Sequence, residues 1–240
     1  MIVDKSSLAY IQNVVHVAAT FKISNLIIEP NRVRAMEESQ CVIILHSDNV
    51  PVLPFGSIGL NRLDVFSSRF AMAQGLDQFA VEATVEDRDP DNVFARAITM
   101  KAKGIKIDYR CANPMTIKAP KMLNETFNWR VQLTSEAVHL IQQAQKAMDT
   151  DDISFIADEK GMSFELADIN NDKLTYKFAD YVDVLESGDG SPAVFVHKYP
   201  IKYITTLFKA NPDGFFVFGA RGTLKGVVKN LDVYVIAIKK

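Results

Sequence analysis

Basic residues at regular spacing are the feature of this sequence best suited to chemistry. Arg62 and Arg69 lie seven residues apart, and Lys202 and Lys209 repeat that spacing in the second half of the chain. Seven residues make two helical turns, so each pair would place two positive charges on one stripe of a helix. Such stripes contact phosphate groups by charge, and they carry no aromatic side chains that could stack on bases. We therefore expect weak, salt-dependent and sequence-independent contact with nucleic acid.

Positive charge is concentrated in four short stretches of a slightly acidic chain. These stretches hold eight lysines and arginines against Asp64 and Glu136, a net charge of +6, whereas the whole chain has a formal net charge of −2. This segregation predicts a basic surface that faces a polyanion. The stretches are 5–22, 60–75, 133–147 and 197–210. The eight candidate contacts are Lys5, Lys22, Arg62, Arg69, Lys146, Lys198, Lys202 and Lys209.

Motifs for catalysis and metal binding are incomplete. Asp168, Asn170 and Asp172 imitate the start of a calcium-binding loop. That loop requires Gly and Glu at positions occupied here by Lys173 and Ala179. The four histidines match no nucleophile or metal pattern. We therefore expect a binding or scaffolding protein, not an enzyme, with no catalytic residue, metal or cofactor. Metal-dependent hydrolysis is the alternative from another class, and its candidate residues are Asp87, Asp89 and Asp91, and Asp149, Asp151 and Asp152.

The composition is that of a folded, soluble chain. Its 240 residues are 48% hydrophobic and 23% charged, which suits one large core or two domains of about 120 residues. No apolar run approaches the roughly 18 residues of a membrane span, and the first residues lack a signal-peptide pattern. Cys41 and Cys111 lack neighbouring metal ligands, so we expect two buried free thiols in a reducing compartment. These features predict a cytoplasmic or nuclear protein without a membrane partner.

The two halves of the chain repeat one order of elements. Apolar residues recur at helical spacing in each basic stretch, as with Leu63, Phe66 and Phe70 in the second. Apolar runs that indicate strands follow each predicted helix. The predicted strands are near 25–29, 32–36, 41–46, 78–86, 93–102, 105–111, 152–157, 162–167, 173–179, 214–219, 222–229 and 232–238.

This repeat predicts the fold class. A module of helix, strands, helix and strands, present twice, indicates an α+β protein whose modules each carry two helices on antiparallel sheets. Pro114 and Pro120 interrupt the pattern between the halves and favour an extended linker. We therefore predict a first module at 1–112, a linker at 113–128 and a second module at 129–240.

Three parts of the sequence carry a family resemblance. In Arg34–Leu45 a Met, an acidic residue and a Ser precede an apolar strand. The second part is Leu133–Met148 followed by Ile153–Met162, and the third is Tyr199–Ala210 with Leu231–Ile238. In this order, and over nearly the whole chain, they resemble DNA polymerase sliding clamps of the two-module type. That family includes proliferating cell nuclear antigen and the T-even-type phage clamps.

The resemblance implies a DNA-clamp fold and a homotrimeric ring of six modules that encircles duplex DNA. Such a ring is a processivity factor in DNA replication: it tethers the replicative DNA polymerase, has a clamp loader as a further partner and needs no cofactor. Its subunits would join edge to edge, with 105–111 pairing with 173–180 of the neighbour. The residues implied at that interface are Ile105, Ile107, Tyr109, Leu174, Tyr176 and Phe178.

The resemblance also implies a pocket under the linker for short peptides with apolar and aromatic anchors. Adaptable methionines suit a pocket shared by several partners. Core packing would explain the same residues equally well. The positions implied are Met36, Gln40, Cys41, Met115, Ile117, Met122, Leu123, Tyr234, Ile236 and Ala237.

Some features depart from the cellular clamps and leave alternatives open. The chain ends in Lys239-Lys240 in place of an acidic tail, and its linker is short, which favours a viral clamp. One alternative is a monomeric or heteromeric relative that binds DNA without encircling it, such as a checkpoint ring subunit or a viral processivity factor. Another is a β-rich structural protein of a virion.

Overall fold

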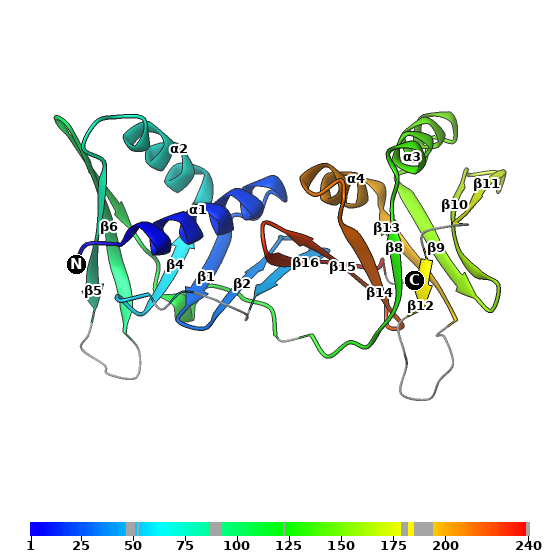
Figure 1. The fold of residues 1–240 in the computed structure, drawn as a ribbon, viewed down its shortest axis with the longest axis horizontal. Helices are drawn as coiled ribbons and strands as arrows, with labels where there is room; N and C mark the ends of the chain where they lie inside the picture. The colour runs from blue at the N-terminus through cyan, green and yellow to red at the C-terminus, as the bar shows by residue number, and fades with distance from the viewer. Residues whose placement is uncertain are drawn as a thin grey trace. The chain divides into compact units, whose positions relative to one another are not determined.

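The structure is a computed structural model that describes residues 1–46, 51, 53–86, 93–121, 123–178, 182–184 and 194–238. It divides the chain into two compact units, Met1–Lys121 and Met122–Lys240 (Figure 1). The predicted linker, 113–128, is shared between the two units. Among the described residues, no helix has the length and apolar character needed to cross a membrane. Positions discussed above that lie outside the described residues are Asp87, Asp89, Asp91, Met122, Ala179, Lys239 and Lys240.

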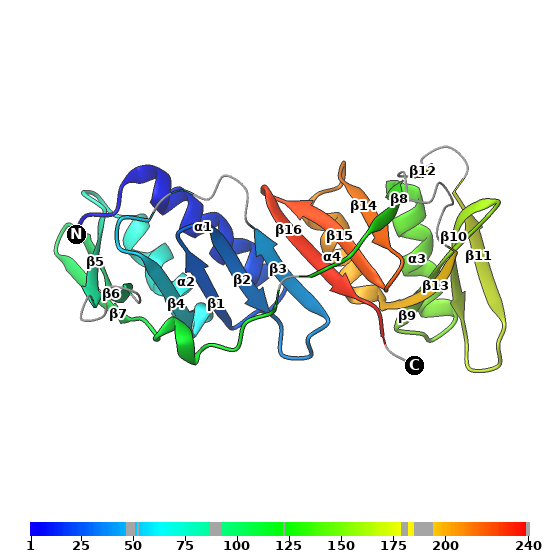
Figure 2. The same cartoon turned by 90° about the horizontal axis from the view of Figure 1, so that it is seen from below.

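Unit 1, Met1–Lys121, forms two α-helices and seven strands within its described residues (Figures 1 and 2). Its strands lie in the order β3-β2-β1-β4-β6-β5, and β7 pairs with β6. The pairs are antiparallel except for β4 and β6, which are parallel. The elements are α1 (Lys5–Thr20), β1 (Asn25–Glu29), β2 (Arg32–Met36), β3 (Val42–His46), β4 (Ser57–Asn61), α2 (Leu63–Gln74), β5 (Ala80–Glu86), β6 (Phe94–Ala102), β7 (Ile105–Arg110) and the 3-10 turn η1 (Pro114–Thr116).

Helix α1 begins at a strong N-terminal cap. The Asp4 carboxylate accepts hydrogen bonds from the backbone N–H groups of Ser6 and Ser7, both at 2.9 Å. Hydrogen bonds from the Ser6 hydroxyl and then from Ser7 hold the pKa of Asp4 well below its usual range. Ile11 and Val15 lie on the buried stripe of the helix. The cap thus fixes where α1 starts, and the apolar stripe fixes which side faces the sheet.

Helix α2 packs on the strands through aromatic rings. The Phe66 ring meets the Tyr109 ring of β7 edge to face, with centroids 5.0 Å apart. Phe70 meets Phe79 in the same way at 5.3 Å. Edge-to-face contacts of this kind add to the free energy gained from burying the rings. They hold α2 beside β7 at the end of the sheet.

Strand β4 was not predicted from the sequence, because it is short and contains a glycine. Gly59 is required there: a Cβ atom would lie 2.5 Å from the Ala112 carbonyl oxygen. The Gly59 carbonyl in turn accepts a hydrogen bond from the Ala112 N–H at 2.9 Å. Glycine is depleted in strands except where two backbones approach closely, as they do here.

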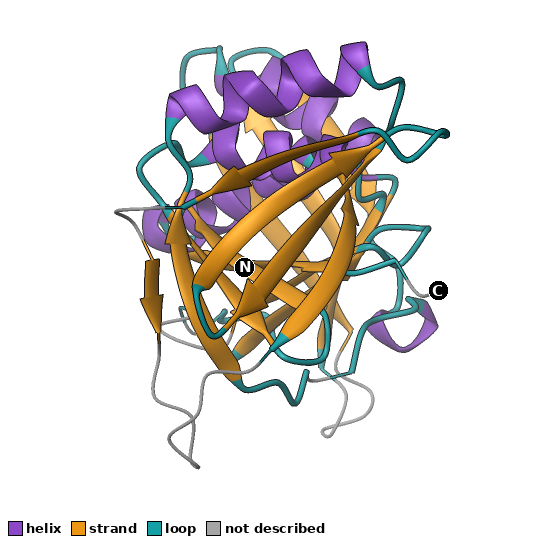
Figure 3. Ribbon diagram, turned by 90° about the vertical axis from the view of Figure 1, so that its right-hand side faces the viewer, coloured by secondary structure: helices purple, strands orange, loops and turns teal. Residues whose placement is uncertain are grey.

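Unit 2, Met122–Lys240, forms two α-helices and nine strands within its described residues, and its helices lie on one side of the strands (Figure 3). Its strands form two antiparallel arrays, in the orders β12-β8-β14-β15-β16 and β11-β10-β9-β13. The elements are β8 (Phe127–Gln132), α3 (Ser135–Ala147), β9 (Asp152–Asp158), β10 (Gly161–Ala167), β11 (Lys173–Lys177), β12 (Val182–Val184), β13 (Phe195–Pro200), α4 (Ile201–Ala210), β14 (Phe215–Gly219), β15 (Thr223–Val228) and β16 (Leu231–Ile236). The predicted α+β class is confirmed, with two helices in each half and antiparallel strand pairs except for the parallel pair β4 and β6 of unit 1.

An aromatic cluster joins the two strand arrays of unit 2. Phe155 is fully buried, and its ring lies 4.7 Å from that of Phe218 and about 6 Å from those of Phe164 and Tyr199. Phe218 belongs to β14, whereas the other rings come from β9, β10 and β13. This cluster therefore packs the array β11-β10-β9-β13 against the array that contains β14.

We predict that Phe155→Ala destabilises the protein by about 3–5 kcal/mol, because it leaves a cavity where the two arrays meet. Urea unfolding followed by circular dichroism measures the change. Ile169→Ala is the control: Ile169 is 96% exposed, so its truncation should change the free energy of unfolding by less than about 0.5 kcal/mol. Equal effects of the two substitutions would contradict this view of the core.

The two cysteines differ in environment. Cys111 is buried, and this burial raises the pKa of its thiol to about 12. Cys41 is half-buried, after the turn that follows β2, and its Sγ lies 3.7 Å from the Ser39 carbonyl oxygen. The prediction of two buried thiols is therefore confirmed for Cys111 and wrong for Cys41.

We predict that one thiol per folded chain reacts quickly with a disulfide reagent at pH 8. Only thiolates attack such reagents, and Cys111 is both inaccessible and protonated. Colorimetric titration of the native protein and of Cys41→Ser measures this. The variant should show almost no fast reaction until it is unfolded. A fast reaction in native Cys41→Ser would show that Cys111 is not shielded.

Candidate nucleic-acid interface

The solvent side of α3 is polar and ends in a lysine. Thr134 caps the helix by accepting a hydrogen bond from the Ala137 N–H at 3.1 Å. His139, Gln143 and Lys146 are exposed, and their spacings of four and three residues place them on one stripe. Lys146 is thus confirmed as a solvent-facing residue of the last turn. His139 was missed as a candidate contact, although its helical spacing from Gln143 would have indicated it.

Helix α4 points both of its lysines away from the sheet. Ile204 and Leu207 are buried, whereas Lys202 and Lys209 are exposed. The Lys202 ammonium lies 4.5 Å from the centre of the Tyr203 ring, a cation–π contact that keeps its charge near the helix surface. The two lysines therefore form the solvent-facing basic stripe that the seven-residue spacing predicts.

Helix α1 has a mostly neutral solvent side with a lysine at each end. Lys5 is its first residue and is exposed. Asn13 and His16 are exposed along the helix, and Lys22 follows it with φ of 57°, in the left-handed region. Relative to the N-terminal caps, His16 of α1 occupies the position that Lys146 occupies in α3. The first helices of the two units therefore share a polar outward stripe.

The arginines of α2 lie differently from the lysines of α4. Arg62 precedes the helix with φ of 108°, and its guanidinium lies 5.4 Å from the centre of the Tyr109 ring. Arg69 is half-buried and donates a hydrogen bond from Nη1 to the Asp108 carbonyl oxygen at 3.2 Å. Both arginines are therefore held against β7, on the flank of α2.

The matching spacing of the two basic pairs does not give matching positions. Arg62 stands one residue before its helix begins, and Lys202 stands one residue after the first residue of α4. That offset of two residues is a rotation of about 200° around a helix. The prediction that both second helices carry the same outward stripe is therefore wrong for α2. Both helices have basic residues, but Arg62 and Arg69 of α2 lie beside the edge strand β7.

Lys198 lies apart from the helices. It belongs to β13, where Phe195 and Tyr199 are buried and Lys198 points to the opposite face of the sheet. Its Nζ is 3.8 Å from the Asp152 carboxylate. Among the eight predicted contacts, Lys198 is thus placed on the strand side of unit 2, away from the solvent sides of α3 and α4.

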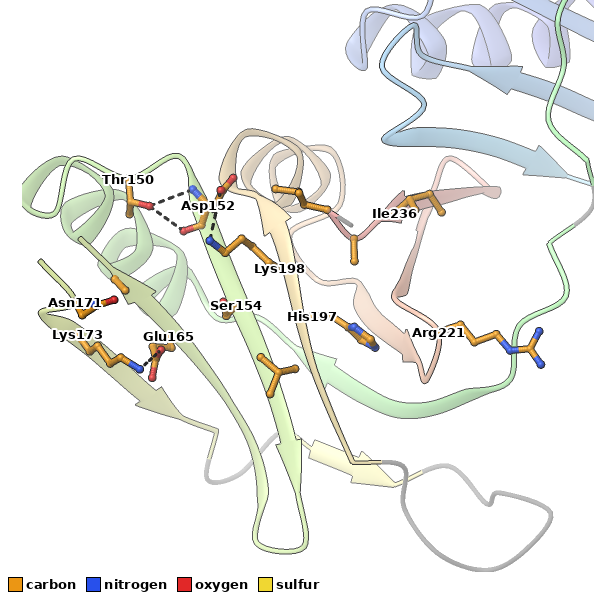
Figure 4. A pocket seen from close by; sticks show the side chains of 14 residues that line it. Thr150, Asp152, Ser154, Glu165, Asn171, Lys173, His197, Lys198, Arg221 and Ile236 are labelled. Carbon is orange, nitrogen blue, oxygen red and sulfur yellow. Dashed lines mark hydrogen bonds and ion pairs between the residues drawn. The ribbon is translucent and has the colours of Figure 1, made fainter. Parts of the chain in front are cut away.

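A cavity of about 730 Å³ lies over this strand side (Figure 4). Its charges are largely paired: Lys198 faces Asp152, and Lys173 forms an ion pair with Glu165 at 2.9 Å. His197 Nε2 lies 2.9 Å from the Ala220 carbonyl oxygen. Both lysines face carboxylates, and the Arg221 guanidinium donates a hydrogen bond to the Asn124 carbonyl oxygen at 3.3 Å. The lysines of this cavity are therefore less available to a phosphate than those on the helix surfaces.

The residues predicted for a peptide pocket all reach the surface of their own unit. None of the nine that the structure describes is fully buried, and Met115 is 79% exposed. Ile236 and Ala237 line the cavity of unit 2. The described positions are Met36, Gln40, Cys41, Met115 and Ile117 in unit 1, and Leu123, Tyr234, Ile236 and Ala237 in unit 2. Full burial in the core therefore does not account for them, and their role in binding stays a prediction.

The predicted interface strands are sheet edges. In the described part of the chain, β7 pairs with β6 alone and β11 pairs with β10 alone. The exposed edges offer apolar side chains that are only half-buried, namely Ile105, Ile107, Leu174, Tyr176 and Phe178. Tyr109 differs, because it is fully buried against Phe66. Tyr109 therefore belongs to the core of unit 1 and cannot contact a neighbour directly.

A metal centre receives no support within the described residues. No group of three or more His, Cys, Asp or Glu side chains is arranged there to hold a metal ion. No metal site is formed by the candidate residues Asp149, Asp151 and Asp152. The side chain of each is at least partly open to solvent. What the described residues present instead is a set of exposed lysines on the helices and, separately, the edge strands β7 and β11.

Comparison with solved structures identifies this architecture. Proliferating cell nuclear antigen of A. fulgidus, solved with the C-terminal region of FEN-1 bound, matches with a TM-score of 0.62 over 100% of this chain and 99% of that chain. The chain has the sliding-clamp fold. Proliferating cell nuclear antigen of Entamoeba histolytica matches with a TM-score of 0.59 over 96% of each chain. Sequence identities are 14% and 13%, and no family model or curated protein matches the sequence.

The shared fold explains why the sequence resemblance to sliding clamps is weak in each segment but extends over nearly the whole chain. At such low identity the likeness lies in the order and packing of elements and not in any one motif. Both matches extend over both units of this chain. The repeated order of elements was therefore the informative signal in the sequence.

We predict that Lys202→Ala with Lys209→Ala weakens binding to duplex DNA and makes it less sensitive to salt. The slope of log K against log salt should fall by roughly one for each phosphate contact removed. Fluorescence anisotropy at several salt concentrations measures both quantities. Lys198→Ala removes one positive charge from the strand side of the same unit, so it is the matched control for each of the single substitutions Lys202→Ala and Lys209→Ala. An equal effect of Lys198→Ala would contradict the assignment of DNA contact to α4.

Proposed function

We propose that this protein is a DNA sliding clamp, in which three copies form a ring around duplex DNA and tether a replicative DNA polymerase. Its role is binding and topological retention, with no reaction of its own. The observation that carries the proposal is the full-length match to two clamps, which covers both units of this chain. A non-encircling DNA-binding relative is the nearest alternative.

The solvent sides of the helices support contact with DNA. Lys146, Lys202 and Lys209 are exposed on α3 and α4, and Lys5 and Lys22 flank α1. Exposed lysines on helices contact phosphates without reading bases, which suits movement along any sequence. Each such contact is weak and is lost at high salt. A closed ring can therefore slide, while its topology prevents dissociation.

Two of the sheet edges, those of β7 and β11, support assembly. An exposed strand edge is prone to unwanted pairing, and proteins usually cover it. The edge of β7 lies in unit 1 and the edge of β11 in unit 2, so head-to-tail pairing of copies would cover both. Repeated head-to-tail pairing gives a ring when the rotation closes. With two units per chain, three chains supply the six modules of the clamps that the sequence resembles.

The surface positions predicted for a peptide pocket support a role as a docking platform. One structural neighbour was solved with the C-terminal region of FEN-1 bound. We propose that DNA polymerase and other replication proteins dock on this chain through short peptides with apolar anchors. The half-buried apolar residues Ile117, Leu123 and Ile236 are candidate contacts. A clamp loader would use the same surfaces transiently.

We predict that the purified protein has a mass of three chains and is retained on circular DNA by topology. Sedimentation velocity gives the mass. For the second test, protein bound to nicked circular DNA is isolated by gel filtration, and the DNA is then cut once. Cutting should release the protein, because a ring slides off a free end. Blocking both ends with streptavidin should prevent the release.

Two results would contradict the proposal. One is a stable single-chain mass at micromolar concentration, which would indicate the non-encircling alternative. The other is equal retention on circular DNA, on cut DNA with free ends and on cut DNA with blocked ends, which would indicate ordinary surface binding. A duplex-binding assay at low salt serves as the control for active protein.

A further inference from the structure

Along each of the edge strands β7 and β11, every second side chain is exposed on the face of the sheet away from the helices. We call these side chains the outward row of the strand, and both rows are rich in positive charge. On β7 this row is Lys106, Asp108 and Arg110, and all three side chains are exposed. On β11 it is formed by exposed Lys173, Thr175 and Lys177. Asp108 is therefore the only carboxylate among six side chains, four of which are cations.

Asp108 occupies the centre of its row. Its Oδ1 accepts a hydrogen bond from the Thr99 hydroxyl at 2.6 Å, and its Oδ2 lies 3.2 Å from the Lys106 ammonium. The hydrogen bond from Thr99, and then Lys106, lowers the pKa of Asp108, so the group stays ionised near neutral pH. Its side chain is still 58% exposed. It can therefore accept a further cation from outside unit 1.

If β7 pairs with β11 of a second copy, a lysine of β11 can supply that cation. If the two strands align fully in either direction, Asp108 lies opposite Thr175, and Lys173 and Lys177 occupy the two diagonal positions. Diagonal neighbours lie about 7–8 Å apart, within reach of long side chains. A slip of two residues in either direction places one of the lysines directly opposite Asp108. A slip of one residue is excluded, because it would turn the apolar rows outward.

We propose that Asp108 is the residue that makes the β7 edge bind the β11 edge of a second copy, by pairing with its lysines. This inference rests on the proposed ring. Without the carboxylate, Lys106 and Arg110 would face Lys173 and Lys177, and like charges across a strand pair repel. Lys173 is already paired with Glu165 in its own chain. Lys177 is therefore the main partner of Asp108.

The decisive experiment compares Asp108→Asn with Glu82→Gln. Asparagine keeps an oxygen that can accept the Thr99 hydrogen bond and removes only the charge. Glu82 is a matched control. It lies on β5 opposite Thr99 of β6, and Thr99 lies opposite Asp108, so both carboxylates are on the same face of the sheet. Glu82 is also paired with a lysine of its own unit, Lys101. Glu82 lies two strands away from the β7 edge, at a distance of about 10 Å. Thermal melting of each variant confirms that it is folded.

We expect Asp108→Asn to weaken self-association by roughly tenfold at about 0.1 M NaCl, with a much smaller effect at about 1 M NaCl, where the Debye length falls to about 3 Å. Glu82→Gln should behave as the unmodified protein does. Sedimentation velocity over a range of protein concentrations measures the dissociation constants. Equal constants for Asp108→Asn and Glu82→Gln at both salt concentrations would overturn the inference.

A charge exchange gives a second test. Asp108→Lys alone should abolish association at about 0.1 M NaCl, because it adds a fifth cation to the paired rows. Adding Lys177→Asp to the same chain should restore trimers. Failure of the double variant to associate better than Asp108→Lys would overturn the assignment of Lys177 as partner.

Ile107→Asp separates this inference from the proposed ring. Ile107 lies on the helix side of β7 and is half-buried, so a carboxylate there would disrupt any pairing along this edge. If Ile107→Asp abolishes association but Asp108→Asn does not weaken it, only the role of Asp108 is lost. If Ile107→Asp leaves the mass unchanged, the edge pairing itself is wrong.

Discussion

A helix that lies on a sheet buries one stripe and leaves the opposite side to solvent, and this constraint underlies the whole account. In each unit both helices bury their apolar residues, Ile11 and Phe66 in unit 1 and Ile141 and Ile204 in unit 2. The polar sides of each helix pair are therefore turned away from the sheet. Since the sheet side is used for packing, the solvent side of the helices is where the chain can carry charge for a ligand.

A second constraint comes from the strands. A sheet satisfies its backbone hydrogen bonds everywhere except at its edges, and β7 and β11 are edges in the part of the chain that the structure describes. Their helix-side rows continue the apolar core, whereas their outward rows carry charge. Pairing between copies would extend each sheet and cover both rows together. The proposed assembly and the proposed DNA contact thus use different surfaces of the same unit and need not compete.

Local sequence patterns predicted the four helices and most of the strands, because helix and strand periodicity depends on neighbours in the chain. They did not predict β4, β8, β12 or β13, and β8 begins within the predicted linker. The solvent-facing Lys146, Lys202 and Lys209 followed directly from that periodicity. Other positions depended on contacts between distant segments. Arg69 reaches the carbonyl group of Asp108, and Tyr109 is buried by Phe66. No spacing rule within one segment contains this information.

Residues that differ from the sequence-based prediction do so for the same reason. Lys198 sits in a basic stretch, but β13 ends at Pro200 before α4 begins, so alternation along the strand turns Lys198 to the other face. Strand β4 was not predicted because it contains Gly59. The need for glycine there comes from the close approach of the Ala112 backbone, which is distant in the sequence. The apolar run predicts a strand that begins at Cys41, although β3 starts one residue later at Val42. In each case a boundary or a distant contact decided the outcome.

The central claim is that the helix sides of both units face the DNA, and site-directed photo-cross-linking tests it most directly. A photoreactive group would be attached to single cysteines in place of His16 on α1, Lys146 on α3 or Lys198 on β13, in a chain whose natural cysteines are replaced by serine. On circular duplex DNA, the account predicts adducts from His16→Cys and Lys146→Cys, and almost none from Lys198→Cys. Adducts from only one unit, or equally strong adducts from Lys198→Cys, would contradict it.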